Sequence, residues 1–183
     1  MPNNSRRQCL KTNILKQKLI SFFILSGLLL SCNSAKRSIS DEDVLKIKTT
    51  IEKIALDNLK DWEPPFHEDK FLQDFTHSDD FKFTVDGFHI NDFEKWKSIV
   101  YESMEFDRVN HKHYKHKIKE IQTIVLSKNS GIVTINYIWD YITNDDLHYN
   151  TPATVTSVYR FENNGWKILN SHVSHGEKRL LEN

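Results

Sequence analysis

The pattern of apolar and polar positions divides the chain into a short apolar run, a helical part and a strand-rich part. Residues 19–30 are apolar except for two serines and one glycine. Farther along, apolar residues recur three and four positions apart over 41–62 and 67–75, and again after Asn91 or Asp92. This periodicity predicts three helices.

Elsewhere apolar and polar residues alternate, which predicts strands because successive side chains of a strand point to opposite faces. Turn residues such as Asn, Asp, Ser and Gly separate these segments. The expected strands cover residues 80–87, 109–127, 132–143, 150–162 and 166–174. This order predicts an α+β domain in which a strongly curved antiparallel sheet wraps around about three N-terminal helices.

The apolar run at residues 19–30 has the features of a secretory signal peptide. It is shorter than the ~20 residues that a helix needs to cross a bilayer. Five basic residues and no acidic residue precede it. A basic segment, a short apolar segment and then small residues are typical of a signal peptide. The alternative is a buried helix ending in a free cysteine, although such a helix carries polar positions at helical spacing.

The apolar run ends in the sequence Leu-Leu-Ser-Cys at 29–32, which resembles the lipobox of bacterial lipoproteins. The resemblance implies that residues 1–31 are a lipoprotein signal peptide and that Cys32 carries a diacylglycerol. Residues 32–40 would then be a lipidated tether to a lipid bilayer, with ~0.8 kcal/mol contributed by each buried methylene. Asn33 after the cysteine favours the outer membrane of a bacterial cell envelope.

Removal of residues 1–31 changes the charge and the cysteine count. The whole chain has 25 basic and 25 acidic residues, and the mature chain would have 20 and 25, a net charge of −5. This charge argues against nucleic acid as a partner, because phosphate binding needs a basic surface. Cys32 would be the only remaining thiol, so we expect no disulfide. No glycine-rich phosphate loop or serine elbow occurs, and no cofactor is expected.

The last predicted strand begins with Gly-Trp-Lys-Ile at 165–168, followed by His172 and, two residues later, a serine. This motif and the order of elements resemble the nuclear transport factor 2-like (NTF2-like) superfamily, in particular its SnoaL-like and calmodulin-dependent-kinase-association-domain-like members. Many members carry a histidine where this chain has Asn170. The resemblance implies a cone-shaped domain over 41–178 with a pocket at one end, a C-terminal tail over 179–183, and pairing of two copies through the outer sheet face.

Candidate ligand-binding residues follow from this pocket and from one face of the strongest predicted strand. That face carries Tyr137, Trp139 and Tyr141. These aromatic side chains either line a cavity or pack as core under the helices. Trp62 and Phe66 follow the first helix, where the resemblance implies the pocket rim; the alternative is a loop packed over the core.

The catalytic candidates are His172, Tyr137 and Asp140, because proton transfer needs an imidazole or carboxylate held in an apolar pocket. His172 is also a ligand-binding candidate, and the alternative is a structural histidine hydrogen-bonded across strands. Asp140 lies on the face opposite the aromatic residues, so it is either a base or a residue at the solvent or at a dimer interface.

The segment HKHYKH at 111–116 raises the question of a metal site. Plain alternation puts His111 and His113 on one side of a strand and His116 on the other, so only two can share an ion. An exposed polar edge strand explains the segment better, and no metal is expected.

The leading functional hypothesis is a membrane-tethered lipoprotein whose cone-shaped domain binds a small apolar or amphipathic molecule without catalysis. The first alternative is an isomerase or dehydratase that uses a pocket histidine, tyrosine or aspartate. The second is a dimeric protein-interaction module that has no ligand.

Overall fold

The computed structural model describes residues 39–163 and 165–181. The signal peptide expected at 1–31, Cys32, and the tether up to residue 38 lie outside the described residues. Among the helices that are described, none is both long enough and apolar enough to cross a membrane.

Three helices form where the apolar stripes predict them. They are α2 (Asp41–Asp61), α3 (Glu68–Gln73) and α4 (Phe93–Asn110). Ser40 caps α2, since its hydroxyl oxygen accepts the Asp43 N–H at 3.1 Å, and Asp92 caps α4 in the same way through the Lys95 N–H at 3.0 Å. Such caps satisfy backbone donors that the first turn leaves unpaired.

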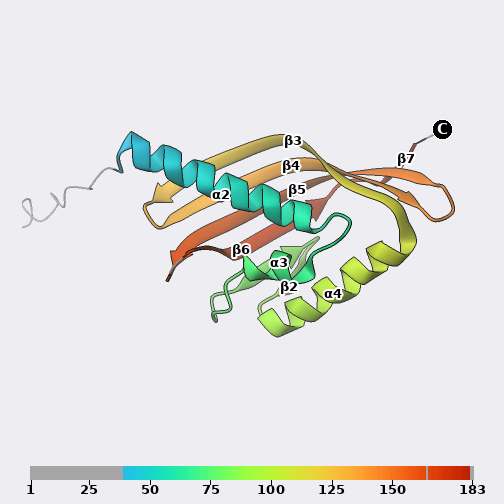
Figure 1. Cartoon of the computed structure of the whole chain (residues 1–183), viewed down its shortest axis with the longest axis horizontal. Helices are drawn as coiled ribbons and strands as arrows, with labels where there is room; N and C mark the ends of the chain where they lie inside the picture. Colours follow the sequence, from blue (N-terminus) through green and yellow to red (C-terminus); the bar gives the residue numbers. More distant parts are fainter. Residues whose placement is uncertain (1–38, 164, 182–183) are drawn as a thin grey trace, which may run out of the picture. The chain divides into compact units, whose positions relative to one another are not determined.

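The strands form one curved sheet. They are β1 (Lys82–Val85), β2 (Phe88–Ile90), β3 (His111–Ser127), β4 (Ser130–Thr143), β5 (His148–Glu162), β6 (Gly165–His175) and β7 (Arg179–Leu180). Their order is β2-β1-β6-β5-β4-β3, and β7 pairs with β5. Figure 1 shows α2 crossing in front of the long strands, with α3 and α4 on the same side. The predicted α+β fold, a curved sheet around a few helices, is confirmed.

Several details differ from the prediction. The sheet is mixed, because β1 runs parallel to β6; alternation along a strand carries no information on its direction. The segment predicted as one strand at 80–87 is part of a β1–β2 hairpin, whose turn residues Asp86 and Gly87 both have positive φ, as a two-residue hairpin requires. The expected tail at 179–183 begins with β7 instead.

Single-residue bulges interrupt the long strands at Lys112, Lys119 and Leu126 of β3 and at Leu169 of β6. Two of them bear on the cavity. In β3 the pairing with β4 shifts by one residue between His111 and His113, so Lys112 is the extra residue. In β6 the extra residue opposite β5 is Leu169. Each bulge reverses which side chains face the helices, because the side-chain period of a strand is two residues.

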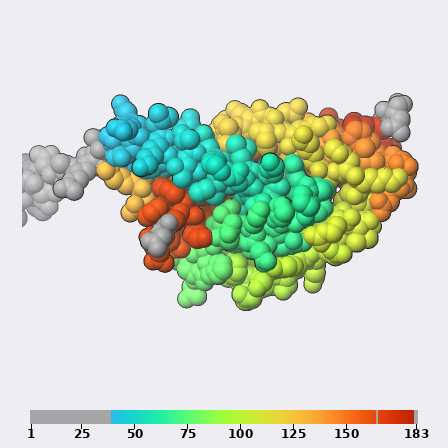
Figure 2. All heavy atoms as spheres, viewed as in Figure 1, coloured from blue at the N-terminus to red at the C-terminus, as the bar shows by residue number. Residues whose placement is uncertain are grey.

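Aromatic residues join the helices to the inner face of the sheet. Trp96 on α4 stacks on Phe83 of β1, with ring centroids 3.7 Å apart. Phe75, which is 2% exposed, contacts both rings at about 6 Å. The space-filling view shows α2, the α3 region and α4 packed over this side of the sheet (Figure 2).

Ile51 on α2 is fully buried, and a methyl group built on Gly131 of β4 would lie only 2.6 Å from its Cδ1 atom. We expect Ile51→Ala to lower the free energy of unfolding by ~2–5 kcal/mol, because it leaves a cavity in a tight contact. Urea denaturation measures this change. Leu45 on the same helix is 65% exposed, and Leu45→Ala is the control, with an expected effect below ~0.5 kcal/mol. Equal losses in both variants would contradict the packing of α2.

Candidate active site in an aromatic cavity

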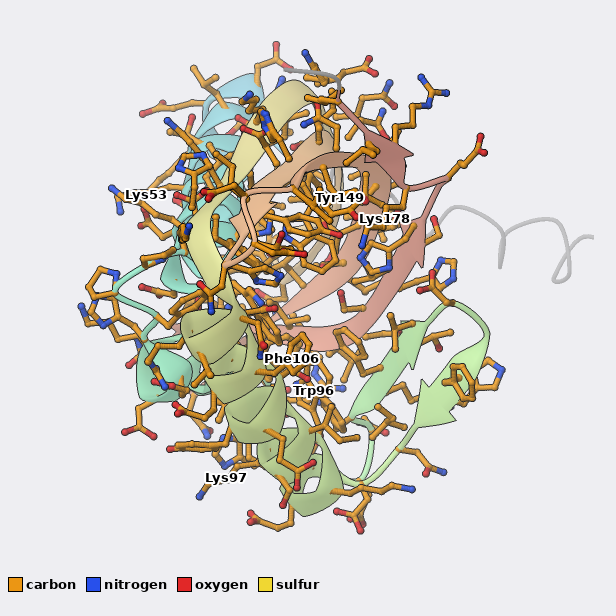
Figure 3. The ribbon with its side chains drawn as sticks, turned by 90° about the vertical axis from the view of Figure 1, so that its right-hand side faces the viewer. Lys53, Trp96, Lys97, Phe106, Tyr149 and Lys178 are labelled. Carbon is orange, nitrogen blue, oxygen red and sulfur yellow. The ribbon has the colours of Figure 1, made fainter. Side chains whose placement is uncertain are left out.

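A cavity of about 880 Å³ lies between the helices and the inner face of the sheet. Its size is within the ~300–1,000 Å³ range of small-molecule sites in proteins. Aromatic and aliphatic side chains from α2, α3, α4 and β1 and β3–β6 make up most of its wall. Phe106 and Lys178 line the cavity and are exposed, so they lie at its opening. Figure 3 shows Phe106 on α4 and Lys178, which follows β6, beside Tyr149 of β5.

Four of the residues predicted to bind a ligand lie in the cavity wall. They are Trp62 at the end of α2 and the β4 residues Tyr137, Trp139 and Tyr141. The three β4 side chains therefore face an open space and are not covered completely by the helices. The other two predicted ligand-binding residues, Phe66 and His172, do not line the cavity.

Phe66 and His172 are outside the cavity wall. Phe66 is 5% exposed and packs edge-on against Tyr114, with ring centroids 5.4 Å apart. His172 is exposed on the opposite face of the sheet. The reason is the bulge at Leu169, which turns Ser171, the residue before His172, toward the helices instead.

Asp140 is buried on the outer face of the sheet, away from the cavity, so the structure contradicts its role as a pocket base. Its carboxylate contacts the Lys117 ammonium at 2.6 Å and the His148 imidazole at 2.7 Å. Burial raises the pKa of Asp140, but the hydrogen bonds from Lys117, His148 and Asn150 lower it more, to about 2. The residue is ionised at neutral pH and belongs to a hydrogen-bonded network on the outer face.

Glu63 and His116 form a carboxylate–imidazole pair at the cavity. Glu63 follows α2, and its Oε1 atom accepts the backbone N–H of His116 at 2.6 Å and lies 3.4 Å from the ring Nδ1. His116 lines the cavity and is 8% exposed. Burial lowers the pKa of His116, against the opposing effect of Glu63. For Glu63, burial raises the pKa but the His116 contacts lower it more. At neutral pH the pair is a neutral imidazole beside a carboxylate.

Asp107 and His111 form a second pair, where α4 meets β3. The Asp107 Oδ1 atom is 3.3 Å from His111 Nδ1, and Oδ2 accepts the indole N–H of Trp62 at 3.0 Å. Burial raises the pKa of Asp107 to about 6, although the hydrogen bond from Trp62 opposes the shift. Burial also lowers the pKa of His111. The Tyr114 ring contacts both His111 and His116, with centroids 5.7 and 5.4 Å away.

A third pair, Asp86 and His175, lies where the β1–β2 turn meets the end of β6. The Asp86 carboxylate accepts the His175 backbone N–H and contacts its Nδ1 atom, each at 2.8 Å. His175 lines the cavity. Near the opening, the Lys178 ammonium lies 3.7 Å from the centroid of the Tyr149 ring.

Reasoning from the sequence missed all three pairs, for two different reasons. His111 and His175 reach the cavity only because of the bulges at Lys112 and Leu169, which plain alternation does not reveal. His116 meets Glu63 only through the fold of the chain after α2. Asp107 did carry a signal, because it continues the buried α4 stripe of Trp96, Val100 and Met104 at helical spacing. A carboxylate within an apolar stripe indicates a buried ionisable group. Within the described ranges, no three His, Cys, Asp or Glu side chains are placed to hold a metal ion.

Solved structures of low sequence identity share this fold. A hexachlorocyclohexane dehydrochlorinase, LinA-type3 from Novosphingobium barchaimii, is 17% identical with a TM-score of 0.64, over 78% of this chain and 94% of that one. A putative scytalone dehydratase from Novosphingobium aromaticivorans is 11% identical with a TM-score of 0.65, over 78% and 93%.

An NTF-2 like protein of unknown function from Shewanella oneidensis is 19% identical with a TM-score of 0.52, over 68% of this chain and 95% of that one. No protein-family model matches the sequence, and no curated protein matches it. At these identities the likeness shows that the domain has the NTF2-like fold, and it does not carry an activity over to this chain.

The contributions of Asp107 and Asp140 to the free energy of unfolding should change with pH in opposite directions. Because its pKa is raised, the Asp107 carboxyl keeps its proton to a higher pH in the folded state than in the unfolded chain. The free energy of unfolding therefore falls as pH rises from about 4 through about 6. The difference between 3.8 and about 6 corresponds to about 3 kcal/mol. We therefore expect Asp107→Asn to gain stability relative to the wild type over this range, by up to about 3 kcal/mol at pH 7.

Asp140→Asn is the matched comparison. Its lowered pKa stabilises the fold above about pH 4, and this contribution is lost as pH falls toward 2. The variant should therefore be less stable than the wild type at pH 7. Urea midpoints measured between pH 4 and 8 test both signs, and a destabilised Asp107→Asn protein at pH 7 would contradict the burial argument.

Proposed function

We propose that the domain binds a small, largely apolar molecule in the cavity and removes a proton from one of its carbon atoms. The observation that carries the proposal is the Glu63–His116 pair in the wall of an aromatic cavity of about 880 Å³. His116 is the base, and Glu63 stabilises the imidazolium that forms. The cavity supplies the binding surface.

The protonation states suit this role. Burial lowers the pKa of His116, so the free base predominates at neutral pH and is ready to accept a proton. Glu63 is ionised, because its pKa is held below the usual value by His116. A carboxylate beside an imidazole stabilises its charged form without taking the proton itself, and the Glu63 Oε1 atom lies 3.4 Å from His116 Nδ1 while it accepts the backbone N–H of the same residue. Removal of water from the site strengthens this electrostatic effect.

The chemical step is an elimination or a double-bond shift. The imidazole takes the proton, the C–H electron pair forms a new π bond, and either a leaving group departs or another atom of the conjugated system gains the charge. Two solved structures that share the fold are named as a dehydrochlorinase and a putative dehydratase. Both names describe eliminations, which supports this reaction class over others.

Binding without catalysis is the second candidate. The Lys178 ammonium above Tyr149 and the exposed Phe106 lie near the opening, and together they suit an amphipathic molecule with a polar end outside and an apolar body inside. The cavity alone supports this function. Turnover by the wild-type protein separates the two candidates.

A nitrobenzisoxazole tests the base, because its ring opens when one C–H proton is removed and the nitrophenolate leaves without protonation. We expect the full-length protein to accelerate this reaction above background, and His116→Gln to lower kcat/KM by about 100- to 10,000-fold, the usual contribution of a general base. His113→Gln is the control, since His113 lies on the same strand and contacts Asp140 on the outer face. Equal rates for His116→Gln and the wild type would refute the assignment.

We further propose that acyl chains on Cys32 hold the domain at a lipid bilayer of a bacterial cell envelope, with the outer membrane favoured. The lipobox-like sequence at 29–32 supports this proposal. Cys32→Ser should abolish incorporation of radiolabelled palmitate and move the protein from the membrane fraction to the soluble fraction. Unchanged membrane association would contradict it. Pairing of two copies through the outer sheet face stays a prediction.

A further inference from the structure

We infer that His175, held by Asp86, is the acid partner of His116 and donates a proton to an oxygen atom of the substrate. The substrate class that follows is a small apolar molecule with a hydroxyl leaving group beside an acidic C–H bond. This inference rests on the proposed function of His116 and adds to it the second half of the proton transfer.

The β1–β2 turn fixes the His175 ring. Asp86 and Gly87 adopt φ values of 46° and 86°, which places the Asp86 carboxylate at the end of β6. One carboxylate oxygen accepts the His175 backbone N–H and the other contacts Nδ1, each at 2.8 Å. Two contacts to one residue hold both its backbone and its ring, so the imidazole has little freedom to rotate.

The pairing with Asp86 determines which ring nitrogen is available. Burial raises the pKa of Asp86, but the contacts from His175 lower it more, so the carboxylate is ionised and can only accept hydrogen bonds. Nδ1 must therefore carry the hydrogen that points at Asp86. Nε2, on the other side of the ring, accepts a hydrogen bond when the ring is neutral and gives a proton to a bound molecule when the ring is the imidazolium, the form in which both nitrogens are donors.

His116 on β3 and His175 on β6 lie on either side of the aromatic residues of β4, because the strand order is β6-β5-β4-β3. The His175 ring lies 5.7 Å from the Trp139 ring, and the His116 ring lies 5.1 Å from the Tyr137 ring. Both histidines line the cavity together with these two residues. A molecule lying on Tyr137 and Trp139 therefore has one carboxylate-held imidazole on each side.

The base, His116, is less exposed to water than the acid, His175, and this difference suits the two roles. The His116 side chain is 5% exposed and the His175 side chain is 26% exposed. A buried base favours the neutral imidazole that accepts the carbon-bound proton. An acid at the cavity edge is recharged with a proton from solvent after each turnover.

The step balances as an elimination of water. His116 takes the proton from the C–H bond, whose electron pair becomes the new C=C bond. The C–O bond breaks, and the oxygen takes the proton of the His175 imidazolium and leaves as water. Afterwards His116 is charged and His175 is neutral, and exchange with solvent restores both. Chloride departs without a proton, whereas hydroxide is too basic to depart unprotonated, so an acid at this place indicates an oxygen leaving group.

Two probe substrates separate the acid from the base. The nitrobenzisoxazole needs only the base, whereas the β-hydroxy ketone formed from benzaldehyde and acetone needs both, since it eliminates water. We expect His175→Gln to lower kcat/KM for the hydroxy ketone by about 100-fold more than for the nitrobenzisoxazole, in line with the usual worth of a general acid. Asp86→Asn should shift the same ratio in the same direction by about tenfold. His172→Gln, on the outer face of the same strand, is the control.

Each outcome distinguishes the inference from the proposed function. A wild-type protein that opens the nitrobenzisoxazole but does not dehydrate the hydroxy ketone overturns the role of His175 and leaves that of His116 supported. Equal losses on both substrates in His175→Gln also overturn it, because a purely structural role affects both reactions alike. No turnover of either probe contradicts the proposed function itself. If His175→Gln melts at a lower temperature than the wild type, the substrate ratio in Asp86→Asn decides.

Discussion

The cavity depends on which side chains of β3 and β6 point toward the helices and which point outward. Both strands are long, and the extra residues Lys112 in β3 and Leu169 in β6 each reverse the face to which the following side chains point. The bulge in β3 brings His111 to the same face as Tyr114 and His116. The bulge in β6 brings Ser171 and His175 to that face and sends His172 to the other. The chemistry of the cavity is thus determined by two local irregularities of the backbone.

Two buried aspartates of this domain have very different pKa values because their surroundings differ. Asp107 and Asp140 are both buried, at 5% and 2% exposure. Asp107 meets an indole and a weakly basic imidazole, so burial prevails and raises its pKa to about 6. Asp140 meets an ammonium, an imidazole and an amide, which prevail over burial and lower its pKa to about 2. The inner carboxyl therefore holds its proton to a higher pH than the outer carboxylate, which is ionised at neutral pH.

The fold was accessible from sequence because helical and strand periodicities are averaged over many residues. Three simple rules were enough: helical spacing of apolar residues for α2, alternation for β4, and the Asp-Gly pair for the turn at 86–87. The site was accessible only in part: Tyr137, Trp139 and Tyr141 share one uninterrupted strand face, and they line the cavity. His172 was predicted as a pocket residue, and it lies on the outer face because the inserted Leu169 alters the strand phase without altering composition. Pairs such as Asp86 and His175, 89 residues apart, depend on strand order, which periodicity does not encode.

The Asp86-Gly87 turn that holds His175 is also an Asp-Gly sequence, a type that is chemically labile in proteins. Glycine has no side chain to hinder attack of its backbone nitrogen on the preceding carboxyl, no atom crowds Gly87, and the Asp86 side chain is 46% exposed. Asp-Gly sequences cyclise slowly to a succinimide, which reopens largely as isoaspartate; the two contacts from His175 to the Asp86 carboxylate oppose this reaction as long as they hold. The added methylene would lengthen the main chain and displace the carboxylate from His175. The turn that orients the imidazole is thereby also the place where an ageing molecule would lose that orientation first.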